Sequence, residues 1–142
     1  MSKSFLLVSP TTEIIIKKLG GEEKSLLVKA TLGGTLTEEN IESLKTWARQ
    51  LSAAIQTASE SIENKQVSVI IDISTFEFYT DPQVLTILAN LMKTDNPFVR
   101  KTATFGGRSD QEMIENIVKG FAGRTNLRNF KTETEAIAWL SV

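Results

Sequence analysis

The segment Val67 to Ile73, with the sequence VSVIIDI, constrains the fold more than any other part of the chain. Its residues are β-branched and nearly all apolar, which is typical of a central strand covered on both faces. Segments with apolar residues at helical spacing lie before and after it. This alternation of helix and strand predicts an α/β fold with parallel pairing.

The rest of the chain supplies the partners of that strand. Further strands are predicted at residues 5–8, 13–19, 25–32 and 99–105, with a short edge strand at 126–130. The intervening GGEEK reads as a hairpin turn, so the first strands are expected to be antiparallel. The sequence therefore predicts one α/β domain over residues 1–142, with a mixed sheet, antiparallel N-terminal strands and parallel βαβ units joined by right-handed crossovers.

Four helices are predicted from caps and apolar stripes. The first begins at Thr37, a good N-cap followed by Glu38 and Glu39, where the helix dipole favours negative charge. Its core stripe is Ile41, Leu44, Ala48, Leu51, Ile55, Ala58 and Ile62. The second runs from Pro82 to Met92, and a turn follows at residues 95–97. Capping boxes at Ser109 and Thr132 start the other two.

The composition removes several classes of function. The chain has 142 residues, a net charge of −1, no cysteine and no histidine. The usual general base, the usual metal ligands and thiolate nucleophiles are therefore missing, so we expect neither an enzyme, nor a metal site, nor a cofactor. The near-neutral charge argues against nucleic acid as a partner.

The N-terminal apolar run, Phe5 to Val8, is too short for a signal-peptide core or a membrane span. We therefore expect a cytoplasmic protein.

The candidate functional segment follows the central strand. Ligands and partners of open α/β sheets meet the loops at the carboxyl ends of the strands. The stretch STFEFYTD fits this position, and Asp81 and Pro82 suit the start of the next helix. The candidate partner- or ligand-binding residues here are Ser74, Thr75, Phe76, Phe78, Tyr79, Thr80 and Asp81. A plain strand-to-helix turn is the competing interpretation.

Two motifs carry a resemblance to a known family. VIIDIS, followed by an aromatic turn and an Asp-capped helix, resembles the central motif of sulfate transporter and anti-sigma factor antagonist (STAS) domains. The C-terminal NFKTETEAIAWL and the segment RKTATFGG resemble the SpoIIAA-like branch, which consists of small bacterial proteins. The resemblance covers about Glu13 to Leu140. It implies a STAS-like fold and a non-enzymatic regulatory or protein-interaction role.

The chain departs from the family at the residue that is phosphorylated there. In the family motif, a serine at the start of the helix accepts phosphate from a partner kinase. One alignment of the motif places Asp81 at that position, and the alternative alignment places Pro82 there. Neither leaves a serine, so the family's phosphoswitch does not carry over directly. Ser74, Thr75 and Thr80 are the nearest hydroxyls.

Three other features stay open. Phe76, Phe78 and Tyr79 either form an apolar contact patch or belong to the core. Gly106, Gly107 and Arg108 form either a turn or an anion-binding nest, and we include them among the candidate binding residues. The basic residues Lys119, Arg124, Arg128 and Lys131 read as a solvated surface.

The sequence leaves two functions to weigh. The first is an interaction module that binds a protein partner through residues 74–85. The alternative is a carrier or sensor of an apolar small molecule or lipid, with a pocket between the aromatic loop and the helices that begin at Asp81 and Ser109. A homodimer and a peripheral membrane contact stay open in both.

Overall fold

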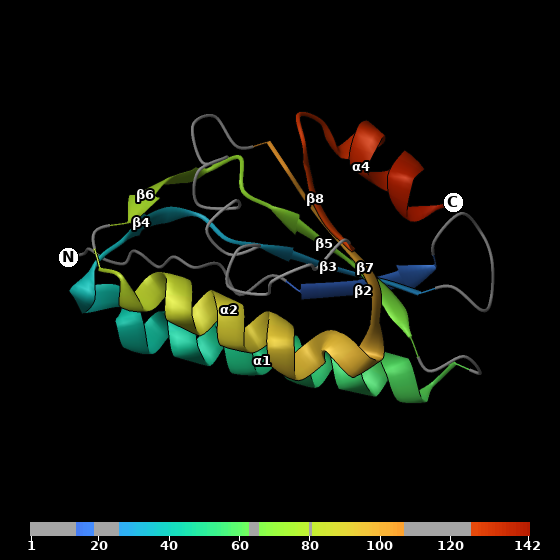
Figure 1. Ribbon diagram of the computed structural model, residues 1–142, viewed down its shortest axis with the longest axis horizontal. Helices are drawn as coiled ribbons and strands as arrows, with labels where there is room; N and C mark the ends of the chain where they lie inside the picture. Colours follow the sequence, from blue (N-terminus) through green and yellow to red (C-terminus); the bar gives the residue numbers. More distant parts are fainter. Residues whose placement is uncertain (1–13, 19–25, 63–65, 80, 107–125) are drawn as a thin grey trace.

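The computed structural model describes residues 14–18, 26–62, 66–79, 81–106 and 126–142. Its main sheet has five strands in the order β2-β3-β5-β7-β8 (Figure 1). Their bounds are β2 Ile14–Lys18, β3 Leu26–Thr31, β5 Val67–Asp72, β7 Val99–Phe105 and β8 Leu127–Phe130. β2 pairs antiparallel with β3, and the other neighbouring pairs are parallel. The predicted mixed α/β fold is confirmed, with β5 in the middle of the sheet.

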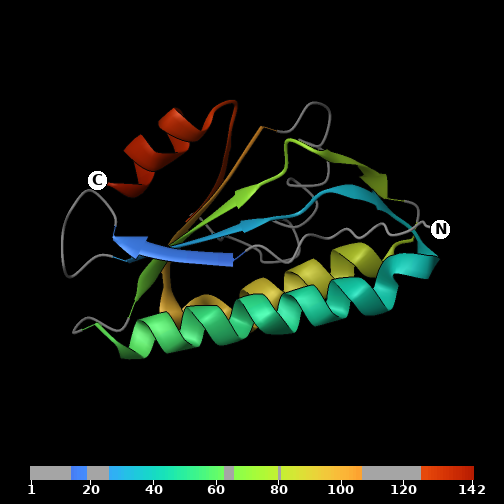
Figure 2. The ribbon, with the colours of Figure 1, turned by 180° about the vertical axis from the view of Figure 1, so that it is seen from behind.

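The helices cover the two faces of this sheet. α1 (Ile41–Glu60) and α2 (Gln83–Asp95) lie side by side on one face, and α4 (Glu133–Leu140) lies on the other (Figures 1 and 2). α2 runs to Asp95, beyond the predicted end at Met92, and a 3-10 turn follows at Asn96–Phe98. The predicted strand at residues 5–8 and the predicted helix after Ser109 lie outside the described residues.

Each side of the sheet buries its own cluster of side chains. Along β5, Val69 and Ile71 belong to the large core under α1 and α2, while Ile70 belongs to a smaller core with Ala136 and Leu140 of α4. Successive side chains of a strand point to opposite faces, so an almost wholly apolar strand fills both cores. The prediction from VSVIIDI is borne out by this burial.

The start of α1 differs from the predicted start in its first turn. Thr37 is a cap as predicted, but it caps a 3-10 turn, Glu38–Asn40, and the α-helix begins at Ile41. Thr37 Oγ1 accepts the Glu39 N–H at 3.2 Å, and Asn40 Oδ1 accepts the Thr37 N–H at 2.9 Å. The predicted stripe omitted Trp47, which is 1% exposed and one of the largest buried side chains among the described residues.

A second, two-stranded sheet corrects the predicted loop. β4 (Gly34–Leu36) and β6 (Phe76–Tyr79) pair in parallel, so residues 76–79 are a strand (Figure 1). The chain after β3 therefore resumes strand pairing at Gly34, the second residue of the Gly33–Gly34 pair. β3 and β5 are already parallel neighbours, so their continuations emerge side by side. Leu36 and Phe76, both buried, anchor this small sheet to the large core.

Candidate functional site

The ladder of the main sheet extends past its strands to a tight turn. The Leu32 N–H donates to Asp72 O at 2.9 Å, and the Ile73 N–H donates to Phe105 O at 2.9 Å. The Gly34 N–H then donates to Thr75 O at 2.9 Å, which starts the pairing of β4 with β6. The chain around the β5–β6 turn is therefore hydrogen-bonded through its backbone to residues 32–34 on one side and to Phe105 on the other.

The turn itself is closed by an aspartate. Asp72 Oδ1 accepts the Ser74 N–H at 2.8 Å, and the Phe76 N–H donates to Ile73 O at 3.1 Å. An aspartate that bonds the amide two residues on is a standard turn-former. The result leaves Ser74 and Thr75 exposed at the carboxyl end of the central strand.

Two glycines enclose these hydroxyl residues. A Cβ on Gly33 would lie 2.2 Å from Thr75 Oγ1, and a Cβ on Gly106 would lie 2.8 Å from Ser74 Cβ. Gly106 also has a φ of +87°, which side-chain-bearing residues rarely adopt. We call Gly33, Ser74, Thr75 and Gly106 the strand-end turn.

Asp81 lies apart from that turn, after β6. Its Oδ1 accepts the Gln83 N–H at 2.9 Å, and its backbone carbonyl accepts the Val84 N–H at 3.0 Å. Pro82 is the residue that borders α2, and Asp81 comes just before it. The Asp81 carboxylate therefore caps the helix from one position further out. This places a negative charge at the positive end of the α2 dipole.

The predicted site residues do not form one cluster. Ser74, Thr75 and Gly106 come together, whereas Asp81 lies apart from them, beyond β6. Phe76 is 4% exposed and packs in the large core, so it follows the core interpretation. The side chains of Phe78 and Tyr79, and residues Thr80, Gly107 and Arg108, lie outside the described part of the chain.

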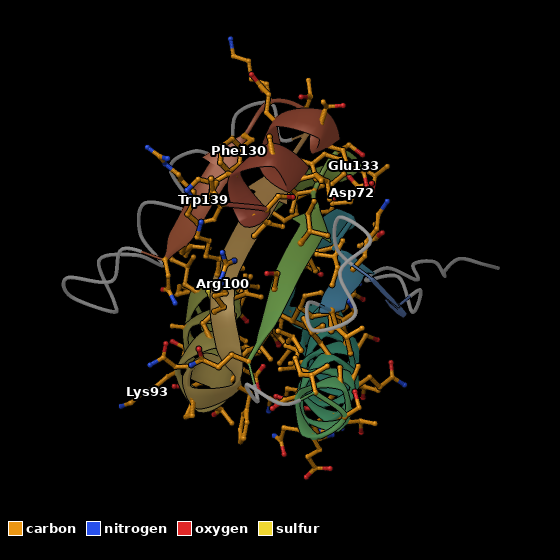
Figure 3. All side chains as sticks on the ribbon, turned by 90° about the vertical axis from the view of Figure 1, so that its right-hand side faces the viewer. Asp72, Lys93, Arg100, Phe130, Glu133 and Trp139 are labelled. Atoms are coloured by element: carbon orange, nitrogen blue, oxygen red, sulfur yellow. The ribbon has the colours of Figure 1, made fainter. Side chains whose placement is uncertain are left out.

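Three basic side chains from β7 and β8 contact the C-terminal end of α4. Lys101 Nζ lies 4.8 Å from the centre of the Trp139 ring and donates to Trp139 O at 2.9 Å, while Arg100 Nη1 donates to Leu140 O at 2.9 Å. Arg128 lies 5.8 Å from the same ring, whose other neighbour is Phe130 (Figure 3). Burial, and then Arg100 and Arg128, lower the pKa of Lys101.

Cations at a helix C-terminus bond its free carbonyls and oppose the negative end of the dipole. The interpretation of Arg128 as plain solvated surface was therefore incomplete, because it stacks on Trp139. The sequence analysis did not single out Arg100 and Lys101, because it treated both only as part of the strand that is β7.

Among the described residues, no three acidic side chains come together in a way that would hold a metal ion. No helix there is long and apolar enough to cross a bilayer.

Comparison with known proteins identifies the fold. The SpoIIAA-like family model matches residues 27–141. An uncharacterized protein with a SpoIIAA-like fold from Shewanella loihica is similar with a TM-score of 0.60 and 17% identity, over 90% of this chain and 92% of that one. An anti-sigma factor antagonist from Mycobacterium paratuberculosis is similar with a TM-score of 0.52 and 16% identity, over 92% and 94%.

A third likeness is to part of a larger protein. SLC26A9 matches with a TM-score of 0.55 and 15% identity, over 83% of this chain but 20% of that one. At these identities the likeness concerns the fold. No curated protein matches the chain.

Proposed function

Because the chain belongs to the SpoIIAA-like family, we propose that it is a non-enzymatic regulatory module that binds a protein partner. Its contact face would be the strand-end turn together with Asp81. The fold, shared with an anti-sigma factor antagonist, suggests a regulatory or interaction role in general. We propose this contact face and this mode of action, and we also propose that the protein is cytoplasmic.

The observation that carries this assignment is an exposed turn whose backbone is hydrogen-bonded to neighbouring strands. Ser74 and Thr75 are exposed, yet the backbone around them is bonded to β3, β4 and β7. Binding pays less for a surface that is already ordered. Two glycines bring neighbouring backbone close to both hydroxyl residues, so a partner would meet backbone as well as side chains.

Asp81 gives this face a charge that needs no modification. In the family motif a serine near this position is phosphorylated by a partner kinase. We infer that Asp81 supplies a permanent carboxylate instead, held by the Gln83 N–H at 2.9 Å. The module would then be constitutive rather than switched by a kinase at this residue.

Affinity capture with matched variants tests the proposal. Wild-type protein is used as bait in a lysate of its own source, beside Thr75→Arg and Asp81→Asn. Asn caps helices as well as Asp, so Asp81→Asn removes the charge and keeps the cap. We expect one protein that wild type retains in stoichiometric amount and that both variants lose.

Two control variants carry comparable changes elsewhere. Thr57→Arg lies on the exposed side of α1, and Glu135→Gln lies on the exposed side of α4. Both should retain the partner. If Thr75→Arg and Asp81→Asn retain it as well as the controls do, the contact face is elsewhere.

A further inference from the structure

A small internal cavity lies between α1, α2 and the sheet. Its volume is about 20 Å³, which is room for one water-sized group. Leu51 and Ile55 of α1, Leu91 and Met92 of α2 and apolar residues of β5 and β7 line most of it. Two polar side chains, Asp95 and Thr102, complete the lining.

Asp95 is the unusual member of this lining. It is 2% exposed, and its Oδ1 accepts the Ser52 hydroxyl at 2.6 Å. Its other oxygen, Oδ2, has no hydrogen-bond partner. A buried carboxylate oxygen without a donor is costly, and the cost is offset only when a donor reaches it. The turn interpretation of residues 95–97 gave no sign of this burial.

The cavity adjoins a surface groove between α1 and α2. Leu91 lines both of them, and Ser52, which lines the groove, donates its hydroxyl hydrogen bond to Asp95. The groove has apolar walls at Ala48 and Ile87. A head group passing between Ser52 and Leu91 would therefore enter the cavity while its apolar body stayed in the groove.

The positive charges of the groove restrict which chemical group of a ligand could approach Asp95. Lys45 and Arg49 line the groove, so a cationic ligand would be repelled on approach. A hydroxyl is neutral, fits a water-sized space and donates one hydrogen bond.

We propose that the Asp95 cavity and the α1–α2 groove form a binding site for a neutral apolar molecule that carries a hydroxyl group. The hydroxyl donates to Asp95 Oδ2, and the apolar body lies along Ala48 and Ile87. Asp95 is at the opposite end of α2 from Asp81, and no lining residue of this site belongs to the proposed contact face, so the site does not depend on the proposed function.

NMR titration of the full chain at pH 8 tests this, with hexan-1-ol and hexan-2-one as probes of similar size. The alcohol donates a hydrogen bond and the ketone only accepts one. We expect saturable shifts of the Ser52, Leu91 and Asp95 amides with the alcohol, and at least tenfold weaker binding of the ketone. The proposal is overturned if these amides do not respond, or if both probes bind equally.

Two variants localise the effect to the acid. Asp95→Asn replaces the Oδ2 acceptor with an NH₂ donor, so the preference for the alcohol should disappear or reverse. Glu135→Gln, on the exposed side of α4, should keep the wild-type preference. Should Asp95→Asn not fold, the comparison of the two probes on wild-type protein still decides the question. Unchanged alcohol affinity in folded Asp95→Asn contradicts the proposal.

Discussion

At the scale of single residues, Gly33 and Gly106 set the geometry of the strand-end turn, because a side chain at either would collide with Thr75 or Ser74. The two positions differ in the kind of obstacle. At Gly33 the nearest atom is a side-chain oxygen, whereas at Gly106 the nearest three atoms are Ser74 Cβ, Cα and N. Gly106 is therefore the harder position to substitute.

Gly106→Ala should lower the free energy of unfolding by about 1–3 kcal/mol, since it combines a φ of +87° with a 2.8 Å approach to Ser74 Cβ. Urea denaturation followed by circular dichroism measures the loss. A change within about 0.5 kcal/mol of wild type, the usual range for uncritical surface positions, would show that the turn yields easily.

Gly33→Ala should be rescued in part by Thr75→Ala. The first change places a Cβ 2.2 Å from Thr75 Oγ1, and the second removes that oxygen. The double variant should lose less stability than the sum of the single losses, with a coupling of about 0.5–3 kcal/mol. Strict additivity in denaturation of all four proteins would mean that the two residues do not meet.

At the scale of elements, specific polar contacts join α1 to α2 and α4 to the sheet, in addition to the apolar packing. Asp95 of α2 bonds Ser52 of α1, and Lys101 of β7 bonds the last turn of α4. Lys29 of β3 also pairs with Glu133 of α4 at 2.8 Å (Figure 3 labels Glu133). These contacts position α1 against α2 and α4 against the sheet.

Lys101→Met should weaken the docking of α4, because it removes the bond to Trp139 O and the cation over the indole ring. We expect a loss of about 1–2 kcal/mol in the free energy of unfolding, measured with urea. Lys131→Met, at an exposed position before α4, is the matched control. Equal effects of the two changes would assign the contact around Trp139 no special role.

Asp95 makes stability depend on pH. Burial raises the pKa of its carboxyl group in the folded state, and the Ser52 hydrogen bond lowers it by less. The protonated form therefore favours the folded state. This contribution is complete below the ordinary value of 3.8 and is lost as pH rises through the raised folded-state pKa.

Asp95→Asn lacks this titration. Its stability relative to wild type should therefore improve as pH rises from below 3.8 to neutral. Urea denaturation of both proteins across that range measures the difference. A difference that does not vary with pH would show that Asp95 titrates normally.

The sequence predicted the elements whose pattern is local and missed those that depend on distant pairing. β5 follows from its almost wholly apolar sequence and α4 from its Thr132 cap, whose Oγ1 accepts the Glu135 N–H at 3.2 Å. The pairing of β4 with β6 was missed, because Gly33 and Gly34 indicate the end of a strand and because β6 is remote from β4 in sequence. Trp47 was missed because the counted stripe passed from Leu44 to Ala48.

The candidate site was predictable in the same partial way. The rule for open α/β sheets led to Ser74 and Thr75, which are exposed at the end of the central strand. No local signal marked Gly33 as their neighbour, since β3 and β5 meet only in the folded sheet. The burial of Phe76 likewise depends on the small sheet that the pattern did not reveal.

At the scale of the whole molecule, the two proposed binding surfaces lie apart. The strand-end turn follows the carboxyl end of β5 and Asp81 lies just before α2, whereas Asp95 lies where α2 ends (Figure 2). We therefore expect variants at one of these surfaces to leave binding at the other unchanged.

Site-specific photo-cross-linking tests the central claim most directly. A benzophenone amino acid is placed at Thr75 on the strand-end turn and, in a matched protein, at Thr57 on the exposed side of α1. The account predicts that the protein captured by wild type cross-links from position 75 and not from position 57. Cross-linking from position 57 alone would contradict the assignment of the contact face.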